Sequence, residues 1–107
     1  MAAKKPYERV YAPDVAKHVS KIEKKYHSLI RDEIERQLRV EPEKETRNRK
    51  PLLRPPDLGS AWELRFGPDN RFRVFYRTDR ERRQVYILAI GIKIRNRLRV
   101  GGEEFDL

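Results

Sequence analysis

The chain has 107 residues, of which 40% are charged and 37% hydrophobic, and its 26 Lys and Arg against 17 Asp and Glu give a formal net charge of +9. This length is typical of one domain, so we expect a single domain over residues 1–107 with a thin core between two packed layers. The absence of cysteine excludes disulfides and thiolate metal sites. The longest apolar run, Val85–Ile90, is too short to span a membrane, and we expect a soluble cytoplasmic protein without membrane contact.

The N-terminal part predicts a strand followed by helical structure. Tyr7–Tyr11 has the period-two pattern typical of a strand, and Pro13 favours the start of a helix. Apolar residues then recur every three or four positions over residues 15–38, as on one face of an amphipathic helix. His27 and Ser28 interrupt this pattern weakly, and Ser28 is a suitable N-cap for a second helix. We therefore predict a two-helix hairpin in preference to one long helix.

The C-terminal half predicts a sheet. Residues 48–60 are rich in proline and are expected to form a long irregular loop. Three period-two segments separated by polar turns follow: Ala61–Phe66, Phe72–Thr78 and Gln84–Lys93. The third segment is apolar on both faces, which marks it as the central strand. Its two expected faces are Val85, Ile87 and Ala89, and Tyr86, Leu88 and Ile90.

These elements predict an α+β fold. We expect an N-terminal strand, a two-helix hairpin and then a three-stranded antiparallel sheet, with the helices on one face of the sheet in a two-layer sandwich.

The first two segments of the predicted sheet bring charged residues together. If their apolar residues share the core face, Leu64 lies opposite Val74, and Arg65 must lie opposite Arg73 on the solvent-facing side. Like charges opposed in this way favour an anion such as phosphate between them. Glu63 projects on the same face, and a carboxylate beside two guanidinium groups can deprotonate a hydroxyl and stabilise charge on phosphorus. The alternative is that Glu63 only forms ion pairs on a solvated surface.

Further cations gather in the same half of the chain, where residues 46–102 hold fifteen basic and five acidic side chains. A run at spacing two after the central strand is expected to point its cations one way, and the proline-rich loop and the hairpin supply others. Each cluster alone is also consistent with a solvated face, but three clusters together favour a polyanion partner. The candidate RNA-binding residues are Arg49, Lys50, Arg54, Arg71, Arg77, Arg95, Arg97 and Arg99.

Aromatic residues and histidines are two further residue classes that can contribute to a binding site. Most aromatic residues fall on the predicted core face, whereas Phe75 shares the face of Arg73 and Arg77 and could stack on a base. His18 and His27 have no second ligand at metal-binding spacing. We therefore expect no metal site and no cofactor.

Four segments carry a resemblance to a known family: Asn48–Leu52, Leu58–Phe66, Phe72–Arg77 and Ile87–Gly91. Together with the order of elements, these segments resemble the RelE/ParE superfamily of type II toxin–antitoxin toxins. The resemblance implies a RelE-like fold and a ribosome-dependent endoribonuclease that cuts messenger RNA without metal, using the ribose 2′-hydroxyl as nucleophile, and so inhibits translation. It also implies a cognate acidic antitoxin, contacts with ribosomal RNA and a toxin–antitoxin hetero-oligomer.

The resemblance also implies roles for particular residues. Arg73 resembles the phosphate-stabilising arginine of the family, and Glu63 and Arg65 lie where relatives place lysine, arginine or glutamate. Lys93 lies where relatives carry a catalytic arginine or lysine. RelE-type enzymes commonly place a tyrosine where this chain reads Arg97–Arg99, so the resemblance assigns no general acid. The candidate catalytic residues are thus Glu63, Arg65, Arg73 and Lys93, with Glu63 or Lys93 as the base and the two arginines on the scissile phosphate.

Two other functions remain open from the sequence. The ParE branch of the superfamily inhibits DNA gyrase without cutting RNA, and a chain with this charge could also be an RNA-binding domain without catalysis. New 5′ ends in cellular messages would distinguish the nuclease from both.

Overall fold

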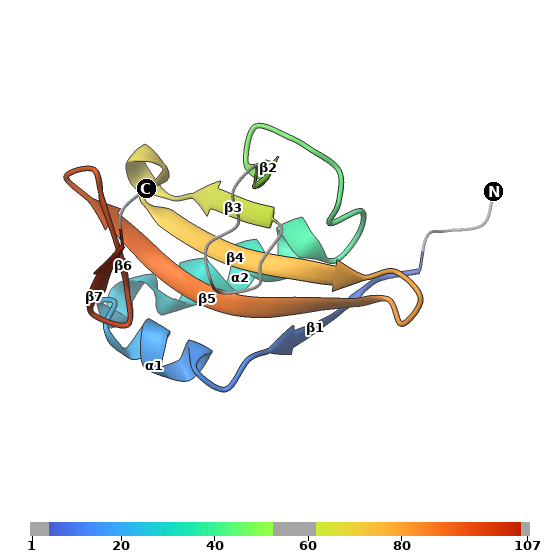
Figure 1. The fold of residues 1–107 in the computed structure, drawn as a ribbon, viewed down its shortest axis with the longest axis horizontal. Coiled ribbons are helices and arrows are strands. Elements are labelled where there is room, and N and C mark those ends of the chain that lie inside the picture. The colour runs from blue at the N-terminus through green and yellow to red at the C-terminus, as the bar shows by residue number, and fades with distance from the viewer. Residues whose placement is uncertain (1–4, 53–61, 106–107) are drawn as a thin grey trace.

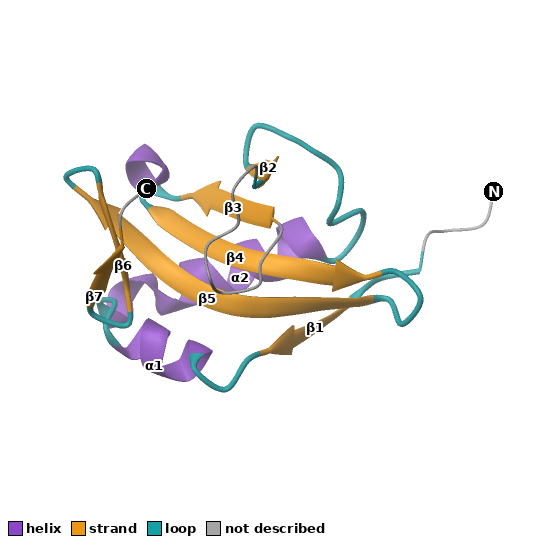
Figure 2. Cartoon of the chain, viewed as in Figure 1, coloured by secondary structure: helices purple, strands orange, loops and turns teal. Residues whose placement is uncertain are grey.

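The computed structural model describes residues 5–52 and 62–105, which form an α+β fold with one main helix and a large, mostly antiparallel sheet (Figures 1 and 2). Within these residues, no helix is long and apolar enough to cross a membrane. The helical elements are α1 (Val15–Ser20), η1 (Lys24–Tyr26), α2 (His27–Leu38) and η2 (Pro68–Asn70). The strands are β1 (Glu8–Tyr11), β2 (Arg49–Pro51), β3 (Trp62–Phe66), β4 (Phe72–Asp79), β5 (Gln84–Ile94), β6 (Arg97–Val100) and β7 (Glu103–Phe105).

The sheet is built around β5. Its order is β2-β3-β4-β5-β6-β7, and these neighbours are antiparallel, whereas β1 pairs with β5 in parallel. Along one edge of β5 lies β4, and along the other β1 covers Gln84–Ile87 before β6 covers Gly91–Ile94. Neighbours on both edges confirm the prediction that this segment is the central strand.

The helices cover one face of the sheet (Figure 1). In α2 the buried residues Ile30, Ile34 and Leu38 recur every four positions, so they form one stripe along the helix. This stripe packs against side chains that alternate along the strands, including Leu64 and Val74. Burial of the stripe stabilises the two layers, because each fully buried Ile or Leu contributes roughly 1.5–3 kcal/mol relative to exposure.

The prediction of a two-helix hairpin and a three-stranded sheet was wrong in detail. The helical segment breaks into a six-residue α1 and a twelve-residue α2, and the break lies at residues 21–26, before Ser28. Ile22 is buried in this connection, and its carbonyl contacts His27 Nε2 at 2.8 Å. The sheet gains strands on both sides because Arg49–Pro51 of the predicted loop pairs with β3, and β6 and β7 form a C-terminal meander.

A bulge changes which residues of β5 face the helices. Phe75 pairs with Ala89 but the next residue, Tyr76, pairs with Ile87, so Leu88 is the extra residue in β5. Up to Ile87 the expected alternation holds, and beyond the bulge it is inverted. The helix-facing side chains are therefore Val85, Ile87, Ile90 and Ile92, and Ala89 faces the other way.

The opposite face of the sheet has a small apolar cluster of its own. Phe75, Ala89, Leu98 and Val100 are buried together there, with Leu52 and Phe105 packed against them. Phe75 is only 2% exposed, so the prediction that it stacks on a base was wrong. In this layer β6 approaches β5 closely, since a Cβ at position 91 would lie 2.7 Å from the Arg99 carbonyl oxygen.

His18 contacts the backbone of β5 between the segments that pair with β1 and β6. Between the stretch that pairs with β1 and the stretch that pairs with β6, the Ile90 amide donates to His18 Nδ1 at 3.3 Å. Nδ1 accepts this hydrogen bond when the imidazole is neutral. Burial lowers the pKa of His18 from its usual 6.5, the charge of Lys17 adds to this, and Asp14 opposes it.

This contact predicts a pH-dependent stability. Below about pH 6.5 the unfolded chain protonates His18 before the folded chain does, so the free energy of unfolding should fall as the pH drops through that range. Urea unfolding at pH 8, 7, 6 and 5 measures the slope. His18→Gln keeps an acceptor that does not titrate, and its slope should be smaller than that of the parent chain. Equal slopes in the two proteins would assign the pH dependence to other groups.

Candidate functional site

The hairpin of β3 and β4 places three charged side chains together. Arg65 pairs with Arg73 across the strands, as the sequence predicted, and Leu64 pairs with Val74 on the helix side. Glu63 lies on the same face as the two arginines. Its Oε1 accepts a hydrogen bond from Arg65 Nε and lies 3.4 Å from Arg73 Nη1. The three side chains form a compact group with a net charge of +1, which we call the Glu63 triad.

Burial distinguishes this triad from a solvated ion pair. Glu63 is 3% exposed and Arg73 6% exposed, whereas the Arg65 side chain is about two-fifths exposed. The expectation that Arg73 faces solvent was therefore wrong. Burial lowers the pKa of the Arg73 guanidinium from its ordinary value, the attraction of Glu63 opposes this, and the repulsion of Arg65 adds to it. A buried group with excess positive charge favours an anion beside it.

The loop before β4 orients Arg73. The Arg73 Nε donates to the Asn70 carbonyl at 2.9 Å. Asp69 and Asn70 have φ of 55° and 51°, so this turn uses left-handed residues, a conformation that Asn and Asp tolerate. Sequence reasoning recognised the turn but missed its role as the anchor of Arg73, and the Asp69-Asn70 pair was the available signal.

Lys93 lies on the same side of the sheet. Gly91 pairs with Arg73, so β5 places no side chain directly beside that guanidinium, and Lys93 follows two residues later on the same face. The Lys93 amide donates to the Arg71 carbonyl at 2.7 Å, which holds the two residues side by side. The structure thus brings all four candidate catalytic residues to one face.

Two predicted RNA-binding residues share this face. Lys50 pairs with Glu63 across β2 and β3, and its Nζ lies 3.4 Å from the Glu45 carboxylate. Arg77 is exposed further along β4, where its guanidinium lies 4.7 Å from the centre of the Tyr86 ring. The strand cations on the side away from the helices, here called the cationic face, are Lys50, Arg65, Arg73, Arg77 and Lys93.

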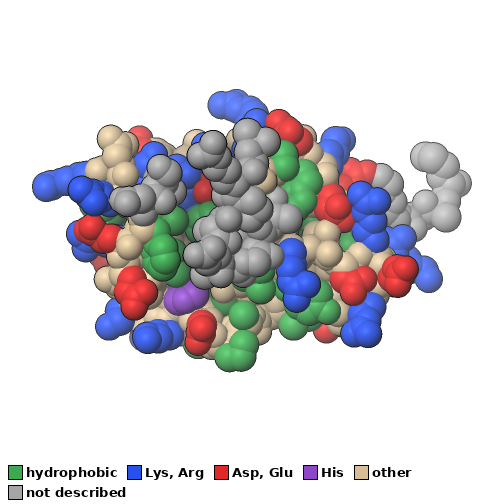
Figure 3. Space-filling view, viewed as in Figure 1, with side chains coloured by type: hydrophobic (Ala, Val, Ile, Leu, Met, Phe, Trp, Pro, Cys, Tyr) green, Lys and Arg blue, Asp and Glu red, His purple; other side chains and the backbone are tan. Residues whose placement is uncertain are grey.

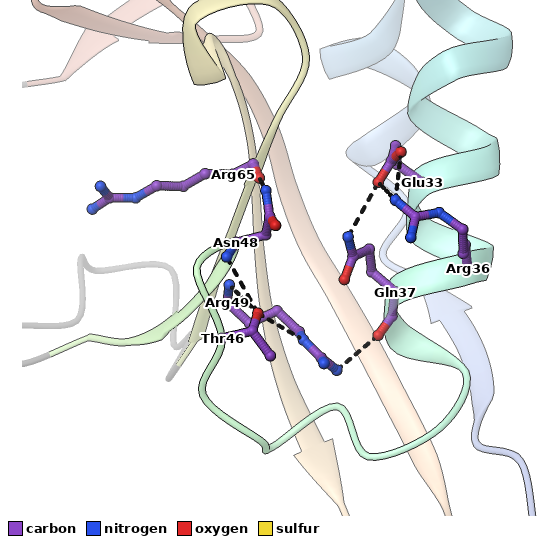
Figure 4. A network of polar contacts seen from close by, with 7 residues as sticks. All are labelled: Glu33, Arg36, Gln37, Thr46, Asn48, Arg49 and Arg65. Carbon is purple, nitrogen blue, oxygen red and sulfur yellow. Dashed lines mark hydrogen bonds and ion pairs between the residues drawn. The ribbon is translucent and has the colours of Figure 1, made fainter.

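Arg49 points the other way (Figure 4). It is 9% exposed, and its Nη1 donates to the carbonyls of Gln37 at 2.9 Å and Glu41 at 2.8 Å. These bonds satisfy carbonyls at the C-terminal end of α2, while the Arg65 side chain extends to the opposite side of the strand. Arg49 therefore holds the backbone near the end of α2, and we leave it out of the candidate RNA-binding surface.

The four cations from Lys93 to Arg99 do not point one way. Arg95 and Asn96 have φ of 50° and 63° and form a tight turn, so Arg97 and Arg99 return on β6 with their side chains opposite to Lys93. Glu104 lies 3.6 Å from Arg97 and 3.1 Å from Arg99. Figure 3 shows basic side chains gathered at this end of the sheet. Arg54 lies outside the described residues.

The described residues contain no group of three or more His, Asp or Glu side chains that could hold a metal ion. The triad and Lys93 supply one carboxylate, two guanidinium groups and one ammonium group.

Comparison with known proteins found a similar fold among solved structures. Neither a protein-family model nor a curated protein sequence matches the chain. Among solved structures, a chain of the toxin–antitoxin complex RelBE2 from Mycobacterium tuberculosis matches with a TM-score of 0.63 and 26% sequence identity, over 79% of this chain and 95% of that one. The chain resembles a RelE-type toxin. This confirms the resemblance inferred from the sequence motifs, now on the basis of the fold.

Proposed function

We propose that this RelE-like chain is the toxin of a toxin–antitoxin system and acts as a ribosome-dependent endonuclease on messenger RNA. The observation that carries the proposal is the Glu63 triad, in which a buried carboxylate lies between two arginines on a cationic face. The likeness to a chain of the RelBE2 complex supports the toxin assignment. We further propose that residues 1–107 act as a single domain in the cytoplasm.

The proposed reaction needs no metal. The ribose 2′-hydroxyl attacks the adjacent phosphorus, its proton passes to a base, and the bond from phosphorus to the 5′-oxygen breaks. The leaving 5′-oxygen takes up one proton, so the products are a 2′,3′-cyclic phosphate and a 5′-hydroxyl. Arg65, Arg73 and Lys93 stabilise the charge on the phosphoryl oxygens, because cations already in place cost little reorganisation in the transition state.

Glu63 is the proposed base. Both of its ion pairs are formed by Oε1, and we assign the removal of the hydroxyl proton to Oε2. Lys93 is the other base candidate from the sequence, but its place beside Arg71 fits a role as a cation for the phosphate better. The exposed cations Lys50 and Arg77 would hold the RNA backbone on either side of the triad.

The proposed partner is an acidic antitoxin that forms a hetero-oligomer with the chain. The RelBE2 chain was solved in a toxin–antitoxin complex. An inhibitor of this site would have to cover the cationic face, and negative charge on the partner would speed association and favour correct binding.

The decisive experiment combines cleavage mapping in cells and in vitro. After induction in a bacterium, 5′ ends of cellular messages should show discrete cuts within translated codons. Purified protein should give the same cuts on ribosome-bound message in the presence of EDTA and leave a cyclic phosphate. Arg82→Ala is a matched control, because Arg82 is exposed in the turn between β4 and β5, at the end of β4 that lies away from the triad.

Each alternative has its own signature in this experiment. DNA breaks that depend on gyrase, without new message ends, would replace the proposal with a ParE-like function. Binding of RNA without cuts or growth arrest would leave an RNA-binding domain. Cuts that require a divalent metal would contradict the proposed mechanism while retaining the nuclease.

A further inference from the structure

A pocket of about 570 Å³ lies next to the Glu63 triad, at the end of the sheet where β4 begins and β5 ends. Three segments surround it: the connection between α1 and α2, the η2 turn, and the turn between β5 and β6. Ligand sites typically have volumes of roughly 300–1,000 Å³. The pocket is therefore large enough for one nucleotide, and we call it the end pocket.

The end pocket combines an apolar wall with a cationic rim. Ile22, Tyr26 and Ile92 line it from the edge of the helix-side core, and Tyr26 is held by its ring contact with Phe72 at 5.1 Å between centroids. The lining also has five basic and two acidic residues, so it attracts anions overall. An apolar and aromatic wall suits a nucleobase, and the rim suits its phosphate.

The two acidic residues of the lining offset only part of this charge, and five basic residues minus two acidic ones leave a net charge of +3. Glu23 lies 3.5 Å from Lys25, and Asp69 lies 4.0 Å from Arg71, so both carboxylates are already near cations. Lys21 follows α1 and Arg95 lies in the turn between β5 and β6, so they come from two different segments of the lining, and both side chains are exposed.

Arg73 connects the end pocket to the triad. It lines the pocket, while its Nη1 lies 3.4 Å from Glu63 Oε1. Lys93 lines the pocket too. An RNA strand whose scissile phosphate contacts Arg73 would therefore bring a neighbouring nucleotide to the pocket opening.

We propose that the end pocket binds the RNA nucleotide next to the cleaved bond, with its base against Tyr26 and Ile92 and its phosphate between Lys21 and Arg95. This inference rests on the proposed nuclease function and adds a specificity subsite to it. Both turns at the rim contain residues with positive φ, Asp69-Asn70 and Arg95-Asn96, so their shape is set by the fold before a ligand arrives.

The test is equilibrium binding of a fluorescent trinucleotide with 2′-deoxy sugars, which cannot form the cyclic phosphate. In the double variant Lys21→Ala/Arg95→Ala the affinity should fall about tenfold or more, since each charged hydrogen bond contributes enough for about that factor. Arg82→Ala removes one exposed cation in the turn between β4 and β5, away from the end pocket. It should change the affinity less than threefold, roughly the effect of a screened distant charge. Thermal melting checks that all three proteins fold.

Competition with small ligands identifies what the pocket recognises. Adenosine, cytidine, guanosine and uridine 5′-monophosphates should displace the probe better than inorganic phosphate, and the strand should bind more tightly than any of them. Equal competition by inorganic phosphate, or unchanged affinity in the double variant, would overturn the inference. Tighter binding of a free monophosphate than of the strand would also overturn it, because the pocket would then serve a free nucleotide.

Cleavage assays separate this inference from the proposed function. If the parent chain cuts ribosome-bound message and the double variant cuts it with unchanged KM and unchanged base preference, the subsite is wrong and the nuclease stands. If the parent chain never cuts but the double variant loses trinucleotide affinity, the nuclease is wrong and the end pocket remains a site for an RNA nucleotide.

Discussion

Arg73→Ala is expected to slow message cleavage by about two to three orders of magnitude, the effect of removing one preorganised donor to a transition state. It should also lower the free energy of unfolding by about 1–3 kcal/mol, because Glu63 is buried and loses one of its two partners. Judged only from the opposition of Arg65 and Arg73, the substitution would relieve repulsion and leave stability level or slightly higher. The burial of both Arg73 and Glu63 reverses that expectation.

A double variant separates the two effects. In Glu63→Gln/Arg73→Ala the two buried positions, 63 and 73, carry no charge, so part of the lost stability should return, while cleavage stays slow. The measurements are urea unfolding and single-turnover cleavage of message positioned on ribosomes. If Arg73→Ala cleaves at the parent rate while folded, Arg73 is a structural residue and the catalytic assignment fails.

Ile87→Ala should lower the free energy of unfolding by about 2–5 kcal/mol, the range for truncating a large buried aliphatic side chain. Ile87 is fully buried in the helix-side core, on the central strand. Chemical unfolding with unchanged m-value would measure the loss.

Leu88→Ala is the matched control on the same strand. It removes the same number of carbon atoms, but Leu88 is the extra residue of the bulge and is half-buried. Its cost should be about 1 kcal/mol, the typical effect of a single substitution outside the core. Equal losses in the two variants would show that the bulge is misplaced and that Leu88 is part of the core.

The register of the β3–β4 hairpin was predictable because only one register buries the apolar residues of both strands on the same face. Apolar residues alternate along both segments, so matching Leu64 with Val74 also fixes Arg65 opposite Arg73. The central position of β5 was predictable for a related reason, since a strand that is apolar on both faces must have neighbours on both faces.

The turn at Arg95-Asn96 could not be predicted from pattern alone. The alternation from Lys93 to Arg99 fits one long strand as well as two strands joined by a tight turn, and Arg95 carries none of the usual preference for a positive φ. Only the close packing of β6 on Gly91 decides between them. The bulge at Leu88 was hidden in the same way, because every residue of that stretch is apolar and no polar side chain marks the shift.

Arg49 shows where charge counting misleads. In a basic half of the chain it looks like another phosphate ligand, yet it is buried and donates to the carbonyl groups at the end of α2. Carbonyl acceptors leave no trace in a side-chain pattern. The role of Arg49 becomes visible only in the fold, where β2 pairs with β3 and the Arg49 side chain reaches the end of α2.

The parallel pairing of β1 with β5 also determines when the protein can fold during its own synthesis. Residues 8–11 pair with residues 84–87, so β1 cannot join the sheet until residues 84–87 have left the ribosome. Contacts this distant in sequence close late, since they carry a high loop-closure cost. Lys93 is made only after these residues. The complete cationic face therefore forms only after residue 93 has been made, and an antitoxin translated at the same time would have its binding surface only from that point.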